Sequence, residues 1–176
     1  MADLLSADGE AAALERLHEL GCTDGLPVVI PTPERVERMV LAVGHPAETS
    51  LGEMGPLQGV CTVEKLATAA VMAGCLPDHM PIVVASALAM MDPRFDLAEM
   101  QGTTHATAPL IIVNGPAREM CGVASGYGAL GPGFRSNASI GRAIRLAMIN
   151  IGGARPGTSD MALLGHGGKF LSLIHI

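Results

Sequence analysis

The chain has 176 residues and a net charge of −6, with 11 Lys and Arg against 17 Asp and Glu. Hydrophobic residues make up 49% of it, and aromatic residues only 2%. A chain of this length and apolarity can bury a core of its own, which excludes disordered, collagen-like and disulfide-framework proteins. The acidic balance and the scarcity of aromatic rings also argue against a nucleic-acid-binding surface.

The cysteines and the start of the chain favour a cytoplasmic protein. The first ten residues lack the basic and apolar regions of a secretory signal. The longest apolar stretches, 82–91 and 109–113, are far shorter than the ~20 residues of a membrane-spanning helix. We therefore expect no membrane association, and free thiols at all four cysteines, none of which belongs to a CxxC pair: Cys22, Cys61, Cys75 and Cys121.

The first half of the chain is predicted to be mostly helical. Apolar residues at helical spacing predict helices over 11–20, 33–43, 62–74 and 79–91. Thr32 is expected to cap the second helix, followed by Pro33 in its first turn. The helix over 79–91 is nearly all apolar, which predicts burial on all sides and an antiparallel hairpin with the helix before it. Between these helices we expect a short strand over 28–30 and an irregular segment over 46–61.

In the second half, a buried strand is expected over 110–113 and a short helical piece over 117–121. A glycine-rich loop over 122–133 then leads to a strong helix over 140–151, capped by Asn137 or Ser139. Helices dominate and strands are short, so we predict an α/β or α+β fold, helix-rich, with a small sheet. We expect one domain over 1–170. Residues 171–176 look like translated adapter read-through from an assembled environmental sequence, which predicts a non-native tail and a fragment incomplete at its C-terminus. The alternative is a genuine short C-terminal strand, and we favour the read-through.

The glycine-rich loop and the helix after it are the first candidate site. A helix start offers unpaired N–H groups and partial positive charge, and glycines let a ligand approach the backbone. Such a site suits a phosphate or carboxylate, and its candidate binding residues are Arg135, Ser136, Asn137, Ser139 and Arg142. Asn114, at the end of the buried strand, could also donate its amide to a ligand, although Asn-Gly-Pro is an ordinary turn. An ordinary capped helix after a flexible loop is an equally good interpretation. The G-x-G-x-x-G at 126–131 does not indicate dinucleotide binding, because no strand leads directly into it.

Further candidates are more scattered. His105, among threonines before the buried strand, could act as an acid or base, although a lone histidine is more often structural. Cys75 could take part as a thiol, but it lies at a helix C-terminus, which raises a thiol pKa. His166 and Lys169 belong to Gly-His-Gly-Gly-Lys, a glycine-rich sequence similar to a lipase oxyanion loop, yet no G-x-S-x-G elbow exists. The residues identify neither a metal nor a cofactor.

Five segments together resemble a known family: TDGLPVVIPTPERV at 23–36, AVMAGC at 70–75 with LP, TTH at 103–105 with IVNGP, GPGFRSNASIGRA at 131–143, and GHGGK at 165–169. They resemble a bacterial family, mostly without an assigned reaction, whose members accompany UGSC-motif (seleno)proteins. The resemblance implies a thiol or selenol redox partnership and a further C-terminal segment.

Two functional hypotheses follow. The first is an enzyme, or enzyme subunit, acting on a small anionic metabolite, with His105 as acid or base and Cys75 as a thiol participant. The alternative is a non-catalytic module that docks a UGSC-type redox protein through its Met- and Ala-rich helices. The oligomeric state does not follow from either hypothesis.

Overall fold

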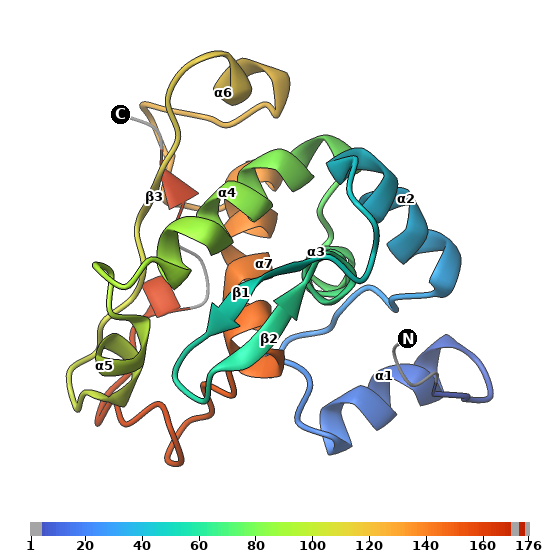
Figure 1. Ribbon diagram of the computed structural model, residues 1–176, viewed down its shortest axis with the longest axis horizontal. Helices are drawn as coiled ribbons and strands as arrows, with labels where there is room; N and C mark the ends of the chain where they lie inside the picture. The colour runs from blue at the N-terminus through green and yellow to red at the C-terminus, as the bar shows by residue number, and fades with distance from the viewer. Residues whose placement is uncertain (1–4, 170–172, 175–176) are drawn as a thin grey trace.

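The computed structural model describes residues 5–169 and 173–174, and it has the helix-rich α+β fold that the sequence predicts (Figure 1). Helix α7 (Arg135–Asn150) runs through the middle of the molecule, and α3 (Val63–Ala73) and α4 (Met80–Met91) pack against it. Two small sheets accompany the helices, one antiparallel and one parallel. Among the described residues no helix combines the length and apolarity needed to cross a bilayer.

The first three helices confirm the predictions from helical spacing. They are α1 (Glu10–Glu19), α2 (Pro33–Val43) and α3. The hydroxyls of Thr32 and Thr62 accept hydrogen bonds from the first turns of α2 and α3, and Gly44 and Gly74 end these helices in the left-handed conformation. The predicted strand at 28–30 is wrong, because this segment has no strand partner; Val29 N–H instead donates to the carbonyl of Met72 at 3.1 Å.

A β-hairpin replaces the irregular segment expected over 46–61. Strands β1 (Ser50–Met54) and β2 (Gly59–Thr62) pair antiparallel. Glycines at 52, 55 and 59 interrupt the alternation of polar and apolar residues by which a strand is predicted. These glycines allow the hairpin to pack closely against Met91, Ala98 and Ile151. A Cβ at Gly59 would collide with the carbonyl oxygen of Ile151, just past α7. The glycine that suggests a loop in the sequence therefore lets the hairpin lie directly on the end of α7.

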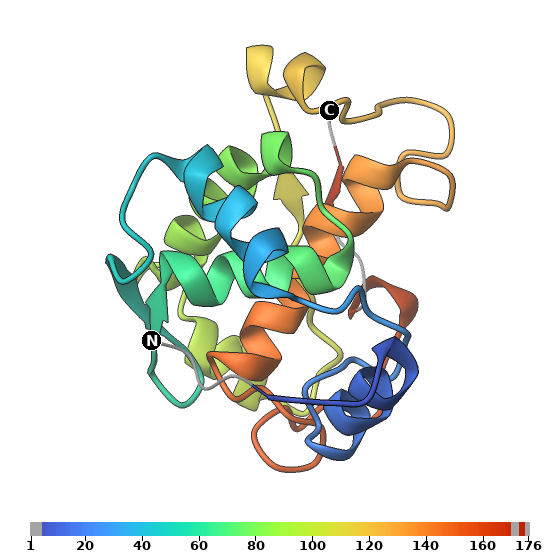
Figure 2. The ribbon, with the colours of Figure 1, turned by 90° about the vertical axis from the view of Figure 1, so that its right-hand side faces the viewer.

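Helix α4 follows a 3-10 turn, η1 (Pro77–His79), and differs from prediction in two respects. It is not buried on all sides, because Leu88 is 46% exposed on its outer face. It also crosses α3 rather than forming an antiparallel hairpin with it, as Figures 1 and 2 show from two directions. The chief partner of α3 is α7. An apolar helix sequence predicts that the helix is buried, but it does not predict which helix packs against it.

The rest of the chain consists of short elements around α7: α5 (Leu97–Gly102), β3 (Ile111–Ile112), α6 (Pro116–Met120), the 3-10 turn η2 (Gly167–Lys169) and β4 (Leu173–Ile174). β4 pairs parallel with β3. α6 and the glycine-rich loop stand apart from the helical body (Figure 2). Helix α7 begins at Arg135, so Asn137 and Ser139 lie in its first turns and neither is its cap. Of the predicted tail, 171–172 and 175–176 lie outside the described residues.

Candidate functional site

The best candidate site is a pocket of about 610 Å³ at one end of α7. Four segments far apart in the sequence form it: residues 21–24, the second half of α7, the loop over 155–162 and residues 165–169. Its volume suits a small metabolite. Much of its lining is charged, unlike the apolar core beside it.

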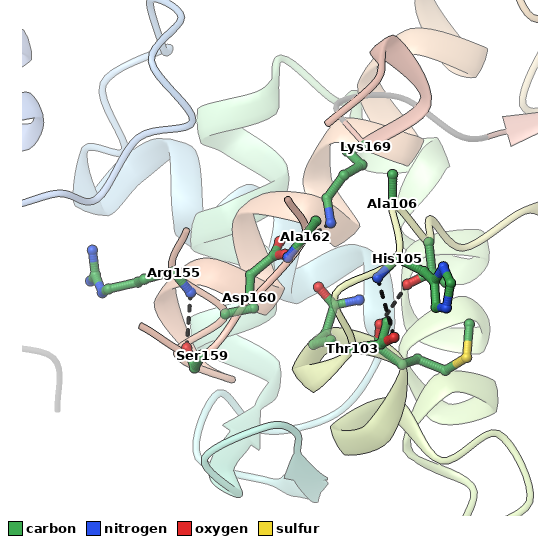
Figure 3. A network of polar contacts seen from close by, with 12 residues as sticks. Thr103, His105, Ala106, Arg155, Ser159, Asp160, Ala162 and Lys169 are labelled. Carbon is green, nitrogen blue, oxygen red and sulfur yellow. Dashed lines mark hydrogen bonds and ion pairs between the residues drawn. The ribbon is translucent and has the colours of Figure 1, made fainter. Parts of the chain in front are cut away.

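Asp160 is the centre of the charged lining (Figure 3). Its side chain is 3% exposed and accepts hydrogen bonds at both oxygens. Lys169 Nζ donates to Oδ1 at 2.9 Å, and Arg145 Nη2 donates to Oδ2 at 3.1 Å. Burial raises the pKa of Asp160, but the hydrogen bonds and the two cations together lower it by more than burial raises it. The pKa of Asp160 therefore lies below its ordinary value. Asp160 therefore stays ionised and holds both cations at the pocket wall.

Arg155 lines another part of the pocket. Its Nη1 donates to the carbonyl of Gly21, which ties the loop after α7 to the segment after α1. Gly21 has φ +65°, and a Cβ there would lie 2.6 Å from Arg155 Nη1. A side chain at position 21 would therefore push the guanidinium out of place. In Figure 3 the Arg155 side chain extends away from Asp160 and Lys169.

Asp24 is the second carboxylate in the lining, and its partner is Arg142 of α7. Arg142 donates through Nε and Nη2, each at 2.8 Å, to the two carboxylate oxygens. Burial raises the pKa of Asp24, and the Arg142 guanidinium with nearby backbone N–H groups more than offsets this, so the pKa is lowered. The pair is neutral as a unit and leaves no free carboxylate on this side of the pocket.

Three of the residues predicted from the sequence lie at or beside this pocket: Arg142, His166 and Lys169. His166 Nδ1 accepts from Gly168 N–H at 3.0 Å, so its proton is on Nε2, which donates to the carbonyl of Ala106 at 2.8 Å. Both ring nitrogens are engaged, and His166 thus anchors the segment that carries Lys169.

A second group of predicted residues meets around His79, which is 2% exposed. Ser136 Oγ donates to the carbonyl of Cys121, so His79 Nε2–H donates to Ser136 at 3.2 Å. His79 Nδ1 accepts from Leu76 N–H at 3.3 Å and from Ser139 Oγ at 3.4 Å. This network fixes one neutral tautomer of a buried histidine and joins η1 to the start of α7.

Cys75 adjoins this network. Burial raises the pKa of its thiol to about 12, although a hydrogen bond with Ser139 and the charge of Arg135 act in the opposite direction. A thiol with this pKa carries almost no thiolate near neutral pH. Cys75 in this conformation therefore has the character of a packed core side chain.

The start of α7 is occupied by the chain itself. Asn137 Nδ2 donates to the carbonyls of Ala124 and Ala129 at 2.9 and 3.0 Å, and Asn137 Oδ1 accepts from Ala124 N–H. Arg135 Nε and Nη2 both donate to the carbonyl of Gly74, at 3.0 and 2.9 Å. The glycine-rich loop and the end of α3 thus use the groups that the sequence analysis assigned to an anion.

His105 and Asn114 are exposed, and neither lines the pocket. The segment around His105 nevertheless adjoins the pocket, because the carbonyl of Ala106 accepts from His166 Nε2 and that of Thr104 accepts from Leu163 N–H at 3.1 Å. His105 N–H donates to Thr103 Oγ1 at 3.3 Å (Figure 3). The structure therefore does not bring the predicted site residues together in one cluster. Within residues 5–169, no three His, Cys, Asp or Glu side chains are grouped so that they could hold a metal ion.

Sequence reasoning missed Arg145, Arg155, Asp160 and Gly21. A weak signal exists for one of them, because Arg145 is a charged residue among the apolar positions 143–148 of α7. Comparison with protein-family models, curated proteins and solved structures found no match to the chain.

Proposed function

We propose that the protein binds a small anionic metabolite in the pocket around Asp160, as an enzyme or enzyme subunit acting on that metabolite. One observation carries this proposal: the pocket has spare hydrogen-bond donors on cations, while its carboxylates are already satisfied. Both oxygens of Asp24 and both oxygens of Asp160 accept from donors of the chain itself.

The cations, in contrast, have donors left over. Within the described part of the chain, the Lys169 ammonium has three donors and one partner, Asp160. The five donors of the Arg155 guanidinium have one partner, the carbonyl of Gly21. A ligand rich in acceptors and negative charge satisfies such groups, whereas a cationic ligand does not. Carboxylates and phosphates have this chemistry.

Isothermal titration calorimetry with inorganic phosphate and with citrate tests the proposal. We expect binding by the wild-type protein and at least tenfold weaker binding by Lys169→Met, since a charge-assisted hydrogen bond contributes about 1.5–3 kcal/mol. Arg94→Ala, which removes an exposed ion pair with Asp92, is the control and should bind normally. The absence of binding to every anion, or equal binding by Lys169→Met, would refute the site.

A second pair of variants tests the geometry. Gly21→Ala and Gly25→Ala both place alanine at positive φ, +65° and +90°, so their backbone strain is similar. Only the Gly21 variant crowds Arg155, because a Cβ at Gly25 meets no atom within 4 Å. We expect the Gly21 variant alone to lose anion affinity. Equal affinities in the two variants would remove Arg155 from the site.

A further inference from the structure

We infer that the ligand is a small dicarboxylate with its two negative groups at opposite ends. This inference rests on the proposed function and specifies the class of metabolite. Three observations carry it: the charge surplus of the pocket, the positions of its cations, and the apolar part of its lining.

The charge surplus of the pocket corresponds to two negative charges on the ligand. Three cations line it, Lys169, Arg145 and Arg155. One carboxylate, Asp160, opposes them, because the charge of Asp24 is cancelled by Arg142. His166 has both ring nitrogens in hydrogen bonds with the chain's own backbone. The three cations and the one carboxylate leave the pocket with a net charge of +2, and a dianion balances it.

These cations are at two separate places. Lys169 and Arg145 are both held by Asp160, whereas Arg155 is held by Gly21. Figure 3 shows Arg155 and Lys169 on opposite sides of Asp160, with the Arg155 guanidinium directed away from the ammonium. A single phosphate is compact, and we expect it to bind either Lys169 and Arg145 or Arg155. Two carboxylates joined by a short chain provide one anionic group for each of these two places.

The apolar part of the lining also suits such a ligand. Ile149 and Pro156 belong to the pocket and offer apolar contact to methylene groups. Guanidinium groups bind carboxylates through two parallel N–H···O bonds, which favours a planar anion at Arg155. A dicarboxylate thus matches the pocket in its net charge, in having two anionic groups for two separate cationic places, and in its apolar methylene groups.

A ligand series on the wild-type protein tests this inference without relying on any variant. Calorimetry at constant ionic strength compares malonate, succinate, glutarate and adipate with monocarboxylates of the same chain length. We expect one dicarboxylate to bind at least tenfold more tightly than its matched monocarboxylate. In Arg155→Met this advantage should disappear, and Arg155→Lys, which keeps the charge, should restore part of it.

The outcomes separate the two proposals. Equal binding of mono- and dicarboxylates, or binding of phosphate alone, would overturn the dicarboxylate inference and leave the anion site in place. If no anion in either series binds, the proposed function itself fails. An advantage for dicarboxylates that persists in Arg155→Met would refute the role of Arg155 at the second end.

Discussion

Arg142, in α7, holds Asp24 by two parallel hydrogen bonds of 2.8 Å across 118 residues of chain. The Asp24 side chain is 2% exposed, so the pair lies largely out of water. Arg142 Nη2 also donates to the carbonyl of Pro27 at 2.9 Å. This contact fastens the segment after α1 to α7, and that segment forms one wall of the pocket.

Asp24→Asn should lower the free energy of unfolding by about 3 kcal/mol, because it leaves the Arg142 guanidinium without its charged partner in a mostly buried position. Urea unfolding measures the loss. Asp92→Asn is the control, since Asp92 pairs with Arg94 at the surface and should change stability little. Equal losses in the two variants would contradict a structural role for the Arg142–Asp24 pair.

The stability of the protein should fall as the pH decreases below about 6.5. Burial and the charge of Arg135 lower the pKa of His79 below its ordinary value of 6.5, although Asp78 acts in the opposite direction. As the pH falls through 6.5, His79 therefore gains a proton in the unfolded chain before it does so in the folded protein. The free energy of unfolding is highest above pH 6.5 and decreases as the pH falls toward the lower pKa of His79 in the folded state.

Urea midpoints at pH 7.5 and pH 5.5 check this prediction. His79→Gln should show a smaller difference between the two midpoints, because it removes the group that titrates. The two proteins differ only at position 79, so the comparison isolates His79. The same pH dependence in both proteins would show that the His79 network is not responsible.

Gly152→Ala should destabilise the fold by about 2 kcal/mol or more, as overpacking against rigid atoms does. A Cβ at this position would collide with the carbonyl oxygen of Gly55 and would lie 2.9 Å from that of Met148. Gly102→Ala is the matched control, since a Cβ there meets no atom within 4 Å. Thermal unfolding of both variants measures the difference, and an equally small effect of both would show that the hairpin can move away from α7.

The Cys75 thiol should resist alkylation in the native protein, because its pKa is about 12 and it is 8% exposed. Iodoacetamide at pH 8, followed by peptide mass spectrometry, should leave Cys75 unmodified and label it only after unfolding in urea. Cys22, which is partly exposed, serves as the internal reference for an accessible native thiol. Rapid native modification of Cys75 would instead support its predicted role as a thiol participant.

The local elements of the fold could be predicted from the sequence because their determinants are close together in the chain. Helix α2 begins after Thr32, at Pro33, and ends before Gly44. Helix α3 likewise begins after Thr62 and ends before Gly74. The β1–β2 hairpin escaped prediction because Gly59 is needed for contact with Ile151, a residue distant in sequence.

The same distinction holds for the candidate site. Charge and residue type were enough to select Lys169, His166 and Arg142 in the sequence, and the helical spacing of apolar residues, with the cap at Thr32, placed most of the helices. Folding brings Arg135 and Asn137 against the chain's own carbonyls. It also brings Asp160 against Arg145 and Lys169, beside Arg155. The physical reason is that a helix cap depends on hydrogen bonds within a few residues, whereas a pocket depends on packing between segments up to 148 positions apart, from Gly21 to Lys169.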